Sequence, residues 1–155
     1  MLVLVHLLLG ACAASGSNAP IANTHDPCTP PSVTTAADAT EVQLDGIAAA
    51  QALWRAHGVP ELGVRPGDAL EVRFQVAAPE FHGLYDDHAS VIYINEDVTD
   101  PTALSIVIAH ELGHAFGLVH VSPDVRSSLM NPGNLNVTPT ADDQRALEAL
   151  WGVCQ

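Results

Sequence analysis

The spacing of hydrophobic and polar positions changes along the chain after residue 40, and it predicts helices and strands in turn. Leu44, Ile47 and Trp54 lie at helical spacing in a segment that opens with the capping-box pattern "TEVQ". Gly58 and Pro60 then end the predicted helix, because neither residue favours its continuation.

Two segments downstream predict strands. Leu70–Val76 alternates apolar with polar residues, which is typical of a half-buried strand. Ser90–Asn95 is almost continuously apolar, which favours a more central strand. The segment between them, "FHGLYDDH", predicts either a short edge strand or a loop.

Two further helices follow the strands. Asp100 and Pro101 form an N-cap and a first helical position, and the helix through "TALSIVIAHELGHAF" should end at Gly117. The last helix begins near "TPTADD" and ends at Gly152. The order of elements predicts an α+β fold in which a small sheet packs on helices.

The chain of 155 residues is predicted to have three parts. Residues 1–12 resemble a signal peptide with a lipobox, "LLGAC", whose Cys12 would carry lipid. An ordinary signal peptide cut nearby is the alternative, because no Lys or Arg precedes the apolar run. Residues 13–39, rich in Ala, Ser, Thr, Asn and Pro, predict a flexible tether, and residues 40–155 predict one domain.

The cysteines support export. If Cys12 carries lipid, Cys28 and Cys154 remain as a disulfide pair, since exported proteins tend to pair their cysteines. Closing so long a loop could stabilise the fold by about 5 kcal/mol. We therefore expect a bacterial cell-envelope lipoprotein or a secreted protein.

The charge balance excludes several partners. Acidic residues number 18 against 5 basic ones, the net charge is −13, and no lysine is present. Nucleic acids and anionic membrane surfaces both need cationic patches, so neither is an expected partner. Contact with a membrane is expected only through the lipid anchor, and the protein is expected to be a monomer.

The segment "HELGHAFGLVH" at residues 110–120 predicts a metal site. His110 and His114 share one helical face, and Glu111 lies beside that face. Gly117 lets the chain leave the helix and return His120 as a third ligand. Three imidazoles around one Zn²⁺ leave a fourth position open, as catalytic zinc sites do.

This segment, followed by "SSLMNP", resembles the metzincin zinc peptidases, whose signature is HExxHxxGxxH plus a methionine-containing turn. The resemblance implies that Met130 forms a hydrophobic floor beneath the histidines. Pro132, two residues later, makes the matrixins the closest group, but matrixins have a tyrosine where this chain has Asn134. The implied fold is a twisted mixed sheet and two helices above a zinc cleft, with the Met-turn and a C-terminal helix below. A first strand of the sheet is expected to be missing or irregular.

The resemblance implies a zinc-dependent metalloendopeptidase. Zinc would lower the pKa of its bound water towards about 7, and Glu111 would act as general base. The protein or peptide substrate would lie extended along an edge strand near His82–Tyr85. The alternatives are a catalytically idle zinc-containing binding module of the cell envelope and a structural lipoprotein in which the histidines merely hold zinc. The presence of Glu111 favours the peptidase.

Other metal sites are weaker predictions. Matrixins bind a second, structural zinc in a region that holds four candidate residues here: His82, Asp86, Asp87 and His88. A solvated acidic loop is the interpretation that we favour. Asp97 and Asp100 could serve calcium, but Asp100 is better explained as a helix cap. A latch of Cys28 on the zinc is weaker than pairing with Cys154.

Overall fold

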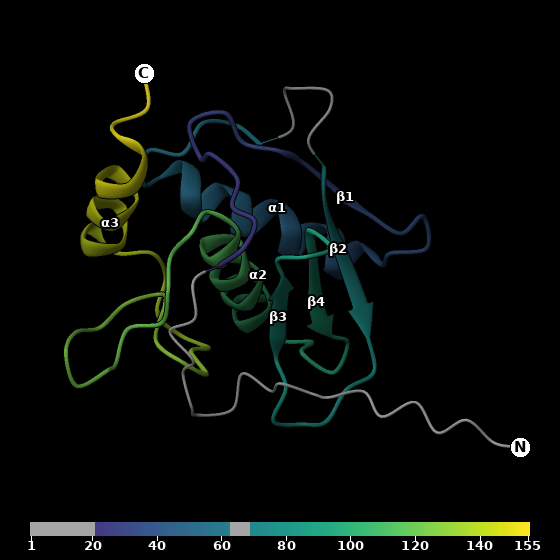
Figure 1. The fold of residues 1–155 in the computed structure, drawn as a ribbon. Coiled ribbons are helices and arrows are strands. Elements are labelled where there is room, and N and C mark those ends of the chain that lie inside the picture. The colour runs from purple at the N-terminus through teal and green to yellow at the C-terminus, as the bar shows by residue number, and fades with distance from the viewer. Residues whose placement is uncertain (1–20, 63–68) are drawn as a thin grey trace, which may run out of the picture.

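The computed structural model describes residues 21–62 and 69–155 (Figure 1). The predicted signal peptide, its Cys12 and the first part of the predicted tether lie outside these residues. The elements follow in the order β1 (Ser32–Thr35), α1 (Glu41–Arg55), β2 (Ala69–Gln75), β3 (Gly83–Asp86), β4 (Val91–Asn95), α2 (Pro101–Ala115) and α3 (Ala141–Trp151). The α+β fold class is confirmed.

The strands form one mixed, four-stranded sheet in the order β1-β2-β4-β3. β2 is parallel to both β1 and β4, whereas β3 is antiparallel to β4. The apolar segment predicted to be central, β4, lies between two strands, and the ambiguous segment before it forms the edge strand β3. Leu70 and Val72, on the apolar face of the alternating strand β2, are fully buried.

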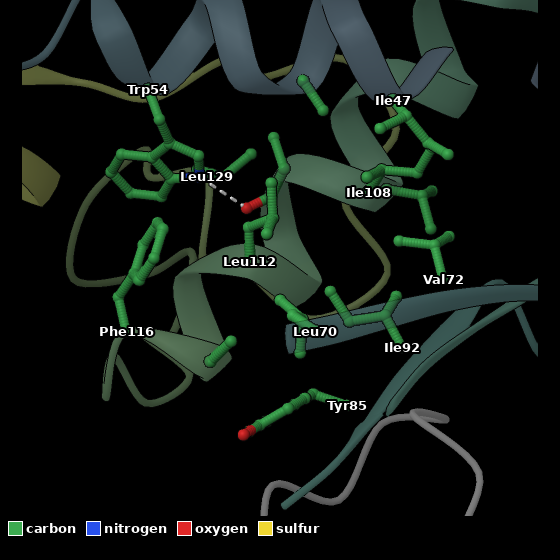
Figure 2. Close-up of a cluster of buried hydrophobic side chains, with 14 of the residues drawn as sticks. Ile47, Trp54, Leu70, Val72, Tyr85, Ile92, Ile108, Leu112, Phe116 and Leu129 are labelled. Atoms are coloured by element: carbon green, nitrogen blue, oxygen red, sulfur yellow. Dashed lines mark hydrogen bonds between the residues drawn. The ribbon is translucent and has the colours of Figure 1, made fainter. Parts of the chain in front are cut away.

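Helix α2 runs through the core. Every residue from Leu104 to Gly113 is buried. Helix α1 packs so closely against it that a Cβ at Gly46 would lie 2.8 Å from the Leu104 side chain. Trp54 of α1 donates its indole N–H to the carbonyl of Ala109 at 2.8 Å. Figure 2 shows where α1, α2 and the sheet meet, in a core that includes Ile47, Leu70, Val72, Ile92, Ile108, Leu112 and Phe116.

The predicted helix starts are confirmed by their caps. Thr40 and Gln43 form a reciprocal capping box at α1. Asp100 accepts from the N–H of Ala103, the third residue of α2, whose first residue is Pro101. Helix α2 ends at Ala115, two residues before the predicted end at Gly117, which has a φ of 96°.

The prediction of a tether over residues 13–39 is wrong for its second half. Residues 32–35 form β1, in which Val33 pairs with Leu70 of β2. The strand was missed because "SVTT" has four residues, one of them apolar, within a Pro- and Thr-rich stretch. The expectation that a first strand is missing or irregular is therefore also wrong, and the folded unit begins before residue 40.

The segment before β1 is attached to the site-bearing part of the fold. The backbone N–H of His25 donates to the carbonyl of Ala115 at the end of α2, at 2.7 Å. The hydroxyl of Tyr85 in β3 donates to the carbonyl of Asn23 at 3.0 Å. These contacts hold the segment against both α2 and the edge strand.

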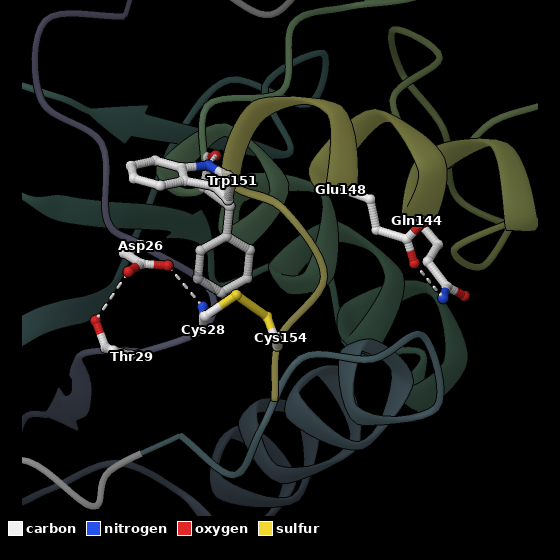
Figure 3. Close-up of a disulfide and its surroundings, with 8 residues drawn as sticks. Asp26, Cys28, Thr29, Gln144, Glu148, Trp151 and Cys154 are labelled. Carbon is white, nitrogen blue, oxygen red and sulfur yellow. Dashed lines mark hydrogen bonds between the residues drawn. A yellow bond between two sulfur atoms is a disulfide. The ribbon is translucent and has the colours of Figure 1, made fainter.

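Cys28 and Cys154 form the predicted disulfide, which spans 126 positions of sequence (Figure 3). Asp26 holds the N-terminal side in place, because its carboxylate accepts from the N–H of Cys28 at 2.8 Å. Trp151, at the end of α3, donates to the carbonyl of Phe116 at 2.8 Å. Among residues 21–62 and 69–155, no helix is both long and apolar enough to cross a membrane.

Replacing Cys28 and Cys154 together with serine should lower the free energy of unfolding by about 2–5 kcal/mol, since the unfolded chain regains a long loop. Urea denaturation monitored by far-UV circular dichroism measures the change. Reduced wild-type protein should match the double variant, and an unchanged midpoint in both would contradict the prediction.

Candidate metal centre

Three histidine rings from two segments converge at the end of α2. His110 and His114 lie one helical turn apart, and the chain turns at Gly117 to return His120. The Nε2 atom of His120 lies 3.2 Å from that of His110 and 3.2 Å from that of His114. The structure thus brings together the three predicted metal ligands.

Backbone carbonyls set the tautomers of two rings. Nδ1 of His110 lies 2.7 Å from the carbonyl oxygen of Leu129, and Nδ1 of His114 lies 2.7 Å from that of Leu118. A carbonyl only accepts, so each Nδ1 carries the hydrogen and each Nε2 keeps a lone pair directed at the other rings.

Burial keeps these rings neutral. It lowers the pKa of His110 to about 4, against the opposing effect of the Leu129 carbonyl. Burial, together with the two neighbouring rings, lowers the pKa of His114 to about 3. Burial also lowers the pKa of His120. Near neutral pH the site therefore presents uncharged imidazoles, which is the form that binds metals.

These residues fit zinc. Nitrogens bound tetrahedrally to one zinc ion at about 2.0–2.1 Å lie about 3.3–3.4 Å from one another. The Nε2 separations of 3.2 Å are close to this value. Lone pairs that face one another at this distance repel unless a cation lies between them. His110, His114 and His120 would hold the ion.

Glu111 lies beside the histidines and is almost fully buried. Its Oε2 accepts from the backbone N–H of Tyr85 in β3 at 2.9 Å. Burial raises its pKa to about 8, and the bond from Tyr85 opposes part of that rise. A Cβ on Gly83 would lie 2.8 Å from Oε1, so the glycine leaves room for the carboxylate.

A small, open pocket lies next to Glu111. It lies between the edge strand β3, helix α2 and the segment after Met130. The residues that line it are His82, Gly83, Val107, His110, Glu111, Gly133 and Asn134. A buried carboxylate, a histidine of the cluster and an open recess therefore adjoin one another.

Met130 packs against α2, the helix that carries His110 and His114. It is fully buried, and a Cβ on Gly113 would lie 2.6 Å from its sulfur. The close approach of Met130 therefore explains why position 113, between His110 and His114, holds a residue without a side chain. The side chain of Trp54 bounds the same space, at 3.2 Å from that Cβ position.

Sequence reasoning missed Asp143, which ties α3 to the segment that carries Met130. Its fully buried carboxylate accepts from the hydroxyl of Ser128, from the N–H of Leu129 at 3.0 Å and from Thr140. The signal was the "TPTADD" capping pattern, from which only a helix start was predicted.

Two residues of the alternative metal sites, Asp86 and Asp100, make local hydrogen bonds instead. The structure does not gather the four candidates for a second zinc: His82, Asp86, Asp87 and His88. Asp86 accepts from the N–H of His88 at 3.0 Å, and Asp100 caps α2. Within the described parts of the chain, the three histidines above form the one group of three or more side chains that could hold a metal ion. Cys28 is in the disulfide and is not a zinc latch.

Comparisons with known proteins agree with this geometry. The family model for matrixins matches residues 37–152. Two structures of myroilysin have a similar fold: one gives a TM-score of 0.59 at 15% identity, covering 88% of this chain and 93% of that one. The other gives 0.57 at 15% identity, covering 85% and 97%. A search of curated proteins found no match.

Gly113→Ala should destabilise the protein, although alanine favours helices. The added methyl group would overlap the Met130 sulfur, and overpacking of this kind costs about 1–3 kcal/mol. Thermal unfolding of Gly113→Ala, Met130→Ala and the double variant forms a cycle that measures the coupling. Additive losses would show that the two residues do not meet.

Asp143→Asn should lower the free energy of unfolding by about 2–4 kcal/mol near pH 7, because an amide nitrogen would face buried donors. Burial alone would raise the pKa of Asp143, but hydrogen bonds from Ser128, Leu129 and Thr140 outweigh it and lower the pKa. The difference should therefore persist above about pH 4 and shrink as the pH falls further and protonates the wild-type carboxylate.

Urea denaturation across pH 3–8 provides the measurement. The half-exposed neighbour Asp142 supplies the matched control, since Asp142→Asn should change stability by less than about 1 kcal/mol. Equal effects of the two substitutions would contradict the role of Asp143.

Proposed function

This chain belongs to the matrixin family, and we propose that it is a zinc-dependent metalloendopeptidase in which Glu111 is the general base. The observation that carries the proposal is the convergence of three neutral imidazoles beside a buried carboxylate that borders a pocket. Family membership supports a metallopeptidase in general, and the assignment of roles to residues is our inference.

His110, His114 and His120 would hold the ion. When bound, zinc would supply Lewis-acid chemistry, polarising the scissile carbonyl and making a water molecule more acidic. The carbonyls of Leu118 and Leu129 would keep the rings in their metal-binding orientation.

Glu111 would move the proton. One carboxylate oxygen of Glu111 accepts from the N–H of Tyr85, and the carboxylate borders the pocket. From there it would accept a proton from the attacking water and deliver it to the leaving amine. Met130 would support the histidines from below through its contact with α2.

The edge strand β3 would align the substrate. Its partner β4 occupies one side only. In a strand, the N–H and C=O of one residue point to the same side. The Tyr85 N–H points to Glu111, so this edge of β3 faces the cleft. An extended protein or peptide segment could therefore pair with this edge.

Export is part of the same proposal. A disulfide persists in oxidising compartments, and Cys28–Cys154 is compatible with one. We propose a bacterial cell-envelope lipoprotein attached through Cys12, or a secreted protein if the leader is cut without lipidation.

Glu111→Ala should retain one zinc ion and lower kcat for cleavage of casein by about 10²–10⁴-fold, since a general base contributes that much. A zinc chelator should abolish cleavage by the wild type. Glu96→Ala, which removes an exposed carboxylate after β4, is the control and should keep full activity.

Zinc content and casein cleavage are measured on the same samples. Unchanged turnover in Glu111→Ala would end this mechanism. One bound zinc without cleavage by the wild type, on casein and on a peptide library, would instead favour the idle binding module.

A further inference from the structure

Asn134 makes four hydrogen bonds within its own loop. Its Nδ2 donates to the carbonyls of Leu129 at 3.1 Å and Val137 at 2.6 Å. Its Oδ1 accepts from the N–H groups of Asn136 at 3.1 Å and Val137 at 2.8 Å. Carbonyls face one end of the amide and N–H groups face the other, so its orientation is determined by its partners. The side chain is thereby held in one position.

One of these partners is the carbonyl that orients a metal ligand. The carbonyl oxygen of Leu129 accepts a hydrogen bond from Nδ1 of His110 at 2.7 Å and a second one from Nδ2 of Asn134. A carbonyl oxygen has two lone pairs, and these two donors can use both. On the other side of the same residue, the N–H of Leu129 donates to Asp143. Asn134 and Asp143 therefore fix the residue whose carbonyl sets the His110 ring.

Asn134 also lines the pocket beside Glu111. The neighbouring Gly133 has no side chain and a φ of 67°, so the wall at this point consists of its backbone and of Asn134. A tyrosine, which the resemblance to matrixins predicts at position 134, has a single hydroxyl and could not make these four contacts. The connection is therefore a property of this sequence.

We propose that Asn134 is a positioning residue that couples the wall of the pocket to the metal ligand His110 through the shared carbonyl of Leu129. The proposal rests on the zinc site proposed above. Without the amide donor, the Leu129 carbonyl is held on that side by His110 alone, and the ring can tilt with it. The expected consequence is weaker and less well-ordered metal binding, because partners of a ligand histidine orient it and raise its affinity.

Asn134→Asp tests the coupling. It keeps an acceptor for the N–H groups of Asn136 and Val137 but loses the donor and places a carboxylate oxygen against the Leu129 carbonyl. Zinc affinity of the apo-protein, measured by competition with a chromophoric chelator, should fall about tenfold. The visible spectrum of the Co²⁺-substituted protein should change in the same variant.

Asn131→Asp is the matched control. Asn131 belongs to the same loop, and its amide likewise bridges the backbone: it donates to the carbonyls of Val121 and Arg126 and accepts from the N–H of Ser128. It does not contact the Leu129 carbonyl, so zinc affinity and the Co²⁺ spectrum should match those of the wild type. Circular dichroism confirms that each variant is folded before metal is added.

If Asn134→Asp does not fold, Asn134→Ser is used in its place. The serine side chain is too short to reach the carbonyl of Leu129, but its hydroxyl can still accept from the N–H of Val137. An unchanged affinity in the Asn134 variant, or an equal loss in Asn131→Asp, would overturn the coupling. Neither the zinc affinity nor the Co²⁺ spectrum requires a substrate. If the Glu111 test fails, the proposed peptidase activity is rejected, but the effect of Asn134 on metal binding can still be interpreted.

Discussion

The convergence of three uncharged imidazole nitrogens is the constraint on which the rest of the structure depends. Nε2 atoms 3.2 Å apart direct lone pairs at one another. Each ring must therefore be fixed by a contact on its opposite side, at Nδ1. The carbonyls of Leu118 and Leu129 hold two of them. Burial of α2 on all sides fixes the spacing of His110 and His114. An amphipathic surface helix would leave their positions freer, which explains why this helix is apolar nearly all round.

The segment from Ser128 to Asp143 then connects the C-terminal helix to the site. Leu129 carries much of this connection, since its carbonyl meets His110 and its N–H meets Asp143 at the start of α3. Met130, next along the chain, fills the space that Gly113 leaves under α2. A buried carboxylate is costly unless it is fully hydrogen-bonded, and the donors around Asp143 meet that requirement. Helix α3 thus helps to position the site, although none of the three histidines belongs to it.

The edge strand links the same site to the N-terminal part of the chain. The N–H of Tyr85 reaches Glu111, and its hydroxyl reaches the carbonyl of Asn23. The following residues continue to Cys28, whose disulfide returns the chain to Cys154 beyond α3. Both ends of the described chain are therefore joined to each other and lie against elements that carry the site.

The sequence alone determined the features that depend on local spacing. The i, i+4 histidines, Gly117 and the N-caps at Thr40 and Asp100 act over a few residues, so their pattern predicted the cluster of histidines and the helix starts. The disulfide followed from a count of cysteines. Only the tertiary structure decided what depends on distant partners. β1 is a strand because β2 offers it a parallel edge, although "SVTT" has little propensity of its own. Asp143, Asn134 and the N–H of Tyr85 acquire their roles from segments that the fold brings together, and no spacing along the chain encodes which backbone group a buried side chain will meet.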